Sequence, residues 1–336
     1  MKGNCSEEHL STAASIVLSV WLSLSGLAAV TENVVALWLF YKHESLRTIS
    51  NRFLASLSVA DAFVGLVIDP YWIVFRCWNS LRVKRKLFII PKMLWIHTTA
   101  ATTLNSCCVS IDRFIAIRFP FRYQDSLTKR RCFAVILLVW LISLSLPFLL
   151  FLRERQEKSE LRVFIAFTMC LVPLLVVCFC YILIFKLARK QFRRILPAKN
   201  IPDSGENVRF RVMQNFKAIK TVGFVLSTCI ITWMPSVVLQ LVTFYYIEEE
   251  KRCGLRKIKF VVSPWVEAIA FTSSAINPLI YYFRNSDFRR AFRRTFHWLP
   301  CVHEQDASHL RAQPERNRLN RNVGTCGNLT AKETEF

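Results

Sequence analysis

Long runs of apolar residues alternate with short polar segments along this chain. Residues 132–152, 163–185 and 221–247 contain no Asp, Glu, Lys or Arg. A helix needs roughly 20 residues to cross the hydrocarbon core of a membrane, so each of these runs is long enough. Together with four further runs the pattern predicts seven membrane-spanning segments. The four further runs, which carry only a few ionisable groups, cover residues 12–41, 53–75, 87–111 and 258–283.

The spans are expected to be helices. In lipid every backbone N–H and C=O needs a partner within the protein, and the alternating pattern of barrel strands is absent here. The predicted fold class is an all-α membrane protein, a seven-transmembrane helix bundle over residues 12–283. Residues 1–11 are expected to be a polar extracellular N-terminus without a secretory signal, so that the first span directs insertion. Residues 195–209 are predicted to be a loop, and residues 299–336 a disordered cytoplasmic tail.

Lys and Arg are divided unevenly between the two sets of connections. Segments that lie on the same side as residues 284–336 hold 28 of them, whereas the opposite loops hold 14. Because positive charge stays in the cytoplasm, we expect the N-terminus outside and the C-terminus inside. Asn4 is then a predicted glycosylation site on the outer side. The net charge of +22 fits this bias and attraction to membrane lipids, and it gives no reason to expect nucleic acid.

A short amphipathic cytoplasmic helix is predicted over residues 286–298. Phe288, Phe292 and Phe296 recur at intervals of four, with arginines between them. Such a helix lies on the membrane surface with its apolar side toward lipid. Cys301 follows it, and either carries a palmitoyl chain as a second anchor or remains an unmodified thiol.

Polar side chains at membrane depth are costly, so each is a functional candidate. Asp61 lies midway along the second span, and other spans place amides and hydroxyls at comparable depth. A carboxylate among such groups either binds Na⁺ or a proton, or stays neutral and only hydrogen-bonds its neighbours. No other metal and no cofactor is expected. The predicted cluster consists of Asp61, Thr102, Asn105, Ser273, Ser274, Asn277 and Asn33.

Three prolines mark positions where helices can bend. Pro173, Pro235 and Pro278 each remove a backbone hydrogen bond in the middle of a span. Trp233 lies two residues before Pro235, so a bulky ring accompanies that bend. Each proline is either a simple kink or a hinge, and three of them around a polar core favour a bundle with two states.

Short motifs follow one another along the spans in a fixed order. They are "NVV" at 33–35, "LSVAD" at 57–61, "DRF" at 112–114, Trp140, Pro173 with Tyr181, "WMP" at 233–235 and "NPLIY" at 277–281. In these motifs the chain resembles the rhodopsin-like (class A) G-protein-coupled receptors over roughly residues 25–298. The amino-acid sequence around its third and sixth helices looks more like that of adenosine and amine receptors.

The resemblance implies a plasma-membrane receptor that signals and does not catalyse. An extracellular small-molecule or peptide ligand would open a cytoplasmic cavity for a heterotrimeric G protein, with arrestin and a receptor kinase as further partners. Arg113, held by Asp112 at rest, would turn toward Tyr181, Tyr281 and the G protein. Phe121 would be the apolar plug of the loop that faces the G protein.

The chain departs from the family's usual disulfide. The family has a Cys 25 residues before the motif arginine, where this chain has Phe88, and residues 152–162 contain no Cys. This loss resembles melanocortin receptors. Cys5, Cys77 and Cys253 remain as candidates on the outer side, with no pairing assigned.

Three further positions narrow the subgroup. Amine receptors hold the ligand ammonium with an Asp at the position of Trp95, and opsins carry their retinal lysine at the position of Phe271. An ordinary amine is therefore not expected to be anchored at residue 95, and the chain is not a retinal-binding opsin. Asn215 stands where many relatives place an acid that restrains the arginine, which predicts measurable basal activity.

The cavity that the resemblance implies is largely apolar and aromatic. Lys92 and Glu267 either form a salt bridge across it, or one of them binds a charged group of the ligand. The basic loop at 81–86 either favours an anionic or acidic-peptide ligand or is simply solvated, and Asp69 offers a further carboxylate. The predicted lining is Tyr71, Lys92, Trp95, Ile96, Thr99, Trp233, Ser236, Val237, Gln240, Glu267 and Phe271.

Two other classes fit less well. A seven-helix transporter or channel predicts inverted repeats or glycine-interrupted half-helices, and the sequence has neither. An intramembrane enzyme needs paired acids, a Ser/His dyad or a His-rich metal set, whereas His97 stands alone at membrane depth. The sequence therefore predicts a receptor that is not an enzyme.

Overall fold

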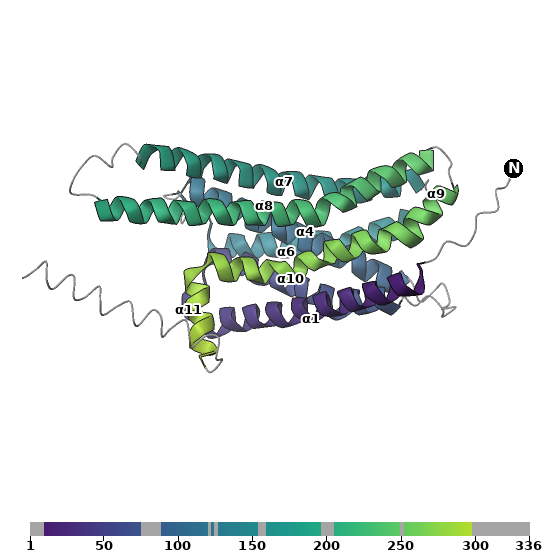
Figure 1. Ribbon diagram of the computed structural model, residues 1–336, viewed down its shortest axis with the longest axis horizontal. Helices are drawn as coiled ribbons and strands as arrows, with labels where there is room; N and C mark the ends of the chain where they lie inside the picture. The colour runs from purple at the N-terminus through teal and green to yellow at the C-terminus, as the bar shows by residue number, and fades with distance from the viewer. Residues whose placement is uncertain are drawn as a thin grey trace, which may run out of the picture. The chain divides into compact units, whose positions relative to one another are not determined.

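The computed structural model describes residues 10–74, 89–119, 122–123, 127–153, 159–195, 205–248 and 252–297 of the chain (Figure 1). The chain divides into two units, Met1–Asn285 and Ser286–Phe336.

Seven long helical rods make up the described part of the first unit, and no strand occurs in it. Two rods are composite, because a π-helix joins α2 to α3 and another joins α9 to α10. The elements are α1 (Thr12–Lys42), η1 (Glu44–Leu46), α2 (Ile49–Phe63), η2 (Val64–Ile68), α3 (Asp69–Trp72), α4 (Ile89–Arg118), α6 (Lys129–Arg153), α7 (Ser159–Ile195), α8 (Gly205–Glu248), α9 (Arg252–Lys257), η7 (Ile258–Val262) and α10 (Ser263–Arg284).

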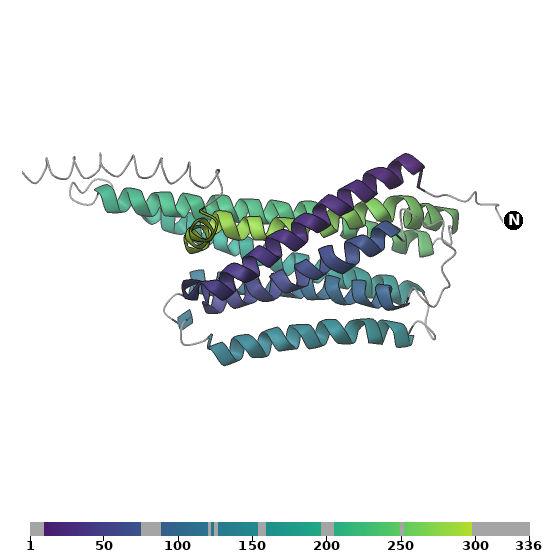
Figure 2. The same ribbon diagram turned by 90° about the horizontal axis from the view of Figure 1, so that it is seen from below.

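The rods pack side by side as a closed bundle. Each helix contacts the next in a ring whose order is α1, α2, α4, α7, α8, α10 and again α1. The α6 helix packs against α4. Figure 1 shows α7 beside α8, and Figure 2 shows α1 running obliquely to the other helices. The outward faces carry large apolar side chains such as Leu24, Leu66 and Phe179, each more than half exposed. Apolar surface on this scale fits contact with lipid.

Four helices of the described residues are long and apolar enough to cross a membrane by length and composition alone. They cover Thr12–Lys42, Ile49–Trp72, Lys129–Phe148 and Ser227–Ile247, and Leu171–Leu187 is a shorter apolar stretch. The α4 and α10 helices fall below this threshold, and several hydroxyl and amide side chains on them are buried in the bundle, among them Thr102, Asn105 and Ser274.

Polar side chains connect the helices across the bundle. Trp140 on α6 donates its indole N–H to Ser56 on α2 at 3.0 Å, and Trp21 on α1 donates to Thr272 on α10 at 3.0 Å. Hydrogen bonds between helices in lipid each contribute about 0.6–2 kcal/mol. These bonds fix how the motif-bearing helices face one another.

Two glycines allow α1 and the second rod to approach closely. A Cβ on Gly65 would collide with the carbonyl oxygen of Gly26. A Cβ on Gly26 would lie 2.8 Å from Asp69 Oδ2 and 3.3 Å from the Gly65 carbonyl oxygen. Small residues at such positions let helix backbones pack against each other in membranes.

The predicted loop at 195–209 is too long, because α7 continues to Ile195 and α8 already begins at Gly205. In the second unit, α11 spans Ser286–Thr295 within the predicted amphipathic segment 286–298. Its first turn carries an ion pair of 2.6 Å between Asp287 and Arg290. The predicted disordered tail at 299–336 lies outside the described residues.

Candidate functional site

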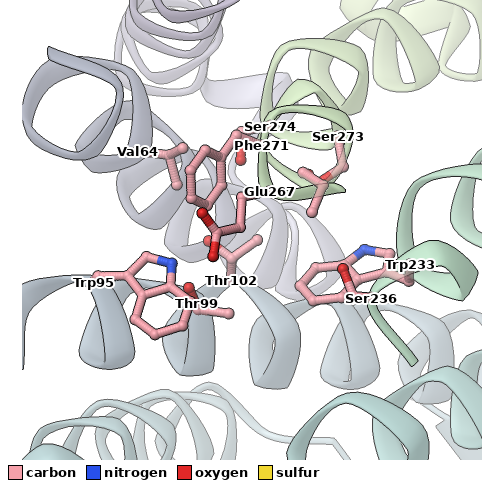
Figure 3. Close-up of a pocket in the computed structure, with 11 residues that line it drawn as sticks. Val64, Trp95, Thr99, Thr102, Trp233, Ser236, Glu267, Phe271, Ser273 and Ser274 are labelled. Carbon is pink, nitrogen blue, oxygen red and sulfur yellow. The ribbon is translucent and has the colours of Figure 1, made fainter. Parts of the chain in front are cut away.

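A cavity lies among α4, α8, α10 and the composite second rod (Figure 3). Its free volume is about 60 Å³, several times the roughly 10–15 Å³ that one water needs. Six predicted ligand residues line it, together with three residues predicted for the polar cluster and two that were missed. The lining is Trp95, Thr99, Trp233, Ser236, Glu267 and Phe271, then Thr102, Ser273 and Ser274, then Val64 and Ala270.

Glu267 is the carboxylate of this cavity. Figure 3 shows it between Trp95 on one side and Trp233 on the other, with Phe271 beside it. The indole N–H of Trp72 donates to Glu267 Oε2 at 2.6 Å. A hydrogen bond to a carboxylate is a strong one, so Trp72 fixes the orientation of Glu267.

Trp72 is also the centre of an aromatic group behind the cavity. Its ring stacks on Trp95 at 5.5 Å between centroids and meets Phe271 edge-on at 5.9 Å. The Nε1 atom of Trp95 is buried without a hydrogen-bond partner among the described residues. Figure 3 draws this nitrogen on the side of the ring that faces Glu267. The cavity therefore offers a free donor next to a carboxylate.

The other predicted ligand residues are placed differently. Tyr71 packs against the apolar cluster around Trp72, and it does not line the cavity. Ile96, Val237 and Gln240 are also absent from the described lining. The side chain of Lys92 lies outside the described residues, so the predicted salt bridge with Glu267 stays a prediction.

The structure brings most of the predicted polar cluster together below the cavity. Ser274 donates its hydroxyl to Asp61 Oδ1 at 2.9 Å, and Asn277 donates Nδ2 to Asp61 Oδ2 at 2.7 Å. Asn33 joins them from α1 by donating to the Ser274 carbonyl at 3.0 Å. Asp61 and Asn33 are fully buried. The predicted convergence of these residues is therefore observed.

This cluster has oxygen atoms to offer a hard cation. The hydroxyl of Thr102 is buried and interacts with Asp61, and Asn105 Oδ1 is buried without a hydrogen-bond partner among the described residues. Asn105 donates its Nδ2 to the Ala101 carbonyl within its own helix at 2.8 Å, and not to Asp61. A carboxylate with neighbouring hydroxyl oxygens fits a small hard cation such as Na⁺.

At the opposite end of α4, Asp112 forms one ion pair and accepts two hydrogen bonds. Arg113 Nη2 lies 3.1 Å from Asp112 Oδ2 in an ion pair, and Ser50 at the start of α2 donates to the same oxygen at 2.7 Å. Tyr123, in the connection between α4 and α6, donates to Asp112 Oδ1 at 2.6 Å. Burial and the bond to Asp112 raise the pKa of Tyr123 to about 12, so its hydroxyl keeps its proton.

Ser50 and Tyr123 were missed by the sequence analysis. Tyr123 lies 11 residues after Asp112 in the sequence, and only the folded chain brings the two side chains together. The hydroxyls of Ser50 and Tyr123 are 2.8 Å apart, so both donors meet on one buried carboxylate. Together they hold α2, α4 and the connection after α4 at one point.

The other predicted switch residues are only partly described. Tyr181 is buried on α7 and packs with Val177 and Ile184. Its contact with Arg113 was predicted for the activated receptor and stays a prediction. The side chains of Tyr281 and Asn215, and Phe121 altogether, lie outside the described residues.

The predicted prolines all lie inside helices. Pro173 is within α7, Pro235 within α8 and Pro278 within α10, and α6 contains a fourth, Pro147. The Pro173 carbonyl accepts a hydrogen bond from the Cys107 thiol on α4, with 3.7 Å between sulfur and oxygen. Whether these sites act as hinges stays a prediction.

The predicted glycosylation site Asn4 and the predicted palmitoylation site Cys301 lie outside the described residues. The disulfide candidates Cys5 and Cys77 also lie outside them. Cys253 is disulfide-bonded, and its partner is also outside them.

Comparison with known proteins agrees with this geometry. The family model "7 transmembrane receptor (rhodopsin family)" matches residues 32–281. The histamine H2 receptor of Canis lupus familiaris is 27% identical over 317 residues, 88% of this chain and 84% of that protein. The octopamine receptor beta-2R of Chilo suppressalis is 25% identical, over 88% of this chain and 84% of that protein. The human adenosine receptor A2a is 26% identical, over 84% and 72%.

These relatives are receptors and not transporters or enzymes. The family match covers most of the chain and includes the "LSVAD", "DRF" and "NPLIY" segments whose side chains form the Asp61 and Asp112 clusters. The chain thus belongs to the rhodopsin family of seven-transmembrane receptors, as a multi-pass plasma-membrane protein that couples an extracellular ligand to a G protein.

Proposed function

We propose that this receptor responds to a small organic cation, and that Glu267 is the counter-ion of that ligand. One observation carries the proposal: the carboxylate of Glu267 stands in a cavity walled by the rings of Trp95, Trp233 and Phe271. Histamine and octopamine, which two of the relatives bind by name, are amines.

The chemistry of the wall supports a cation. A cation over the face of a tryptophan ring gains about 0.5–2 kcal/mol, and tryptophan is the best of the aromatic residues for this contact. A carboxylate in an apolar cavity favours pairing with an opposite charge, because the site is poorly solvated. Trp72 holds Glu267 in place, so the anchor is oriented before the ligand arrives.

With Glu267 as the anchor, the receptor does not need the Asp that amine receptors carry at the position of Trp95. Residue 95 is Trp here, and its ring stacks on the tryptophan that orients Glu267. The carboxylate is supplied by α10 in place of α4. The free Nε1–H of Trp95 suits a ligand that also has a hydrogen-bond acceptor close to its cationic group.

At the other end, Asp112, Ser50 and Tyr123 support a resting state in which Arg113 is held. Ligand binding would release Arg113 toward Tyr181, Tyr281 and the G protein. We place the N-terminus outside and the C-terminus in the cytoplasm, on the distribution of Lys and Arg. Arrestin, a receptor kinase, membrane lipids at α11, glycosylation at Asn4 and palmitoylation at Cys301 belong to the same proposal.

Na⁺ at Asp61 is a further part of this proposal. Asp61 supplies the charge, and Thr102 and Ser274 supply hydroxyl oxygens beside it. The ion would stabilise one state of the bundle.

The test is a ligand screen on cells that display the receptor, with second-messenger readouts for several classes of G protein. The panel holds matched cationic, neutral and anionic small molecules. An active cation should lose potency by roughly 10- to 150-fold in Glu267→Gln, which corresponds to the loss of about 1.5–3 kcal/mol for a charge-assisted bond. Glu44→Gln, at an exposed carboxylate, is the matched control and should respond like the wild type.

Two results would overturn the proposed ligand class. One is an active anion that needs Lys92, as the basic loop at 81–86 would favour. The other is an active cation with equal potency on wild type and Glu267→Gln at equal surface levels.

A further inference from the structure

Asp69 is a buried carboxyl group that the proposed function does not use. It is 1% exposed, at the start of α3, and both of its oxygens are buried without a hydrogen bond from any described residue. A charged carboxylate in such a place costs far more than a neutral one, because neither water nor a partner solvates it. The group therefore needs a partner or a proton.

The backbone beside Asp69 has an acceptor to offer. The N–H of Asp69 bonds to the Val64 carbonyl, five residues back, because η2 is a π-helix. Pro70 has no N–H, so the next bond of that pattern, to the carbonyl of Gly65, is not made. Both oxygens lie close to the position that a Cβ on Gly26 of α1 would take. The Gly65 carbonyl oxygen is 3.3 Å from that position, and Asp69 Oδ2 is 2.8 Å from it.

We propose that Asp69 is a proton-binding site, where a neutral carboxylic acid donates its O–H to the Gly65 carbonyl and seals the contact with Gly26. The proton is the ligand, and the site consists of Asp69, Gly65 and Gly26. Loss of the proton leaves a bare carboxylate between α1 and the second rod. That charge draws in water and loosens the close contact of the two glycines.

The site is placed to affect the ligand cavity. Trp72 follows Asp69 by three residues in the same turn, and it donates to Glu267. A shift of α3 therefore changes the orientation of the proposed anchor. This consequence rests on the proposed function, whereas the proton site itself does not.

Other titratable groups nearby do not replace the proton. The elements that pack on α3 are α1 and η2, together with α4 and α10, which meet Trp72 through Trp95 and Phe271; η2 contains no titratable group. On α1 the first is Glu32, six residues beyond Gly26 and thus about 9 Å along the helix. Asp61 bonds to Ser274 and Asn277, and Glu267 bonds to Trp72.

Infrared difference spectroscopy on the full-length receptor in lipid nanodiscs tests the proposal. The wild type at neutral pH should show a carbonyl stretching band of a buried carboxylic acid that Asp69→Asn lacks. Asp287→Asn, at the exposed carboxylate of α11, should leave the band unchanged. A wild-type spectrum identical to that of Asp69→Asn would overturn the proposal.

Thermal unfolding gives a second readout. An acid that stays neutral in the folded protein but ionises in the unfolded chain makes the protein less stable as pH rises. From about pH 5 to about pH 8 the wild type should lose more stability than Asp69→Asn, whose amide can donate to Gly65 at any pH. An equal pH dependence of the two proteins contradicts the proton site.

The wild type alone also decides the question if Asp69→Asn does not reach the membrane. The acid band should diminish as pH rises, and it should shift in heavy water because the group carries an exchangeable proton. Stabilisation by NaCl but not by choline chloride, lost in Asp69→Asn and retained in Asp61→Asn, would instead assign the site to Na⁺ and overturn the proposal.

Discussion

The hydroxyl of Tyr123 donates a hydrogen bond of 2.6 Å to the carboxylate of Asp112, from a connection that follows α4. Asp112 also holds Arg113 at 3.1 Å, so Tyr123 and Arg113 share one acid. The restraint on Arg113 is thus a local network and not a single ion pair.

Tyr123→Phe should raise basal signalling. It removes a hydrogen bond to a charged acceptor, worth about 1.5–3 kcal/mol, which enlarges the active population severalfold or more. The measurement is ligand-free second-messenger output at matched surface expression. Tyr41→Phe, at an exposed tyrosine, is the control and should not change the output.

Ser50→Ala should act in the same direction through the other oxygen of Asp112. If both variants keep the basal output of the wild type, the network around Asp112 does not restrain the receptor.

Asp61→Asn should abolish any stabilisation of the receptor by Na⁺. At about ten times its dissociation constant, an ion that binds only the folded state stabilises it by about 1.4 kcal/mol. Unfolding of the purified receptor in NaCl and in choline chloride measures the difference. Thr102→Ala should reduce it, and a difference that persists in Asp61→Asn would contradict a Na⁺ site at this cluster.

Cys253→Ser should destabilise the receptor, because Cys253 is disulfide-bonded. Loss of a disulfide costs about 2–4 kcal/mol, so surface expression and unfolding temperature should fall. Cys178→Ser, at a free thiol, is the control. Peptide mapping without reduction identifies the partner, for which Cys5 and Cys77 are the predicted candidates, and equal stability of the two variants would speak against a structural role of the bond.

Gly65→Ala should destabilise the contact of α1 with the second rod. The added methyl group collides with the Gly26 carbonyl, and overpacking of this kind costs about 1–3 kcal/mol. Leu66→Ala alters the same π-helix at an exposed side chain and should cost much less. Unfolding temperatures of the two purified variants decide the matter; a Gly65→Ala protein as stable as Leu66→Ala would refute the close packing.

Sequence patterns predicted the helices and the polar cluster well, for a physical reason. Lipid forces apolar runs of a minimum length, and it leaves few places for Asp61, Ser274 and Asn277 except the inside of the bundle. Their mutual contacts follow from that restriction. Ser50 and Tyr123 had no such signal, because polar residues at the membrane boundary are common and their meeting depends on the path of a connection.

The cavity shows another limit of prediction from sequence. The resemblance to the family predicted Tyr71 in the lining of the ligand cavity, whereas Trp72 is the residue that bonds to Glu267. The π-helix at Val64–Ile68 inserts extra backbone into its turn and so rotates every residue after it. The sequence gives no sign of this π-helix, so the rotation of Tyr71 and Trp72 could not be predicted from it.

The same π-helix separates α2, which holds Ser50 and Asp61, from α3, which holds Asp69 and Trp72. One residue gained or lost between Val64 and Ile68 would turn the part that holds Asp69 and Trp72, while Asp61 and Ser50 kept their partners. The orientation of the residues that surround Glu267 is thus set separately from that of the residues that hold Asp112.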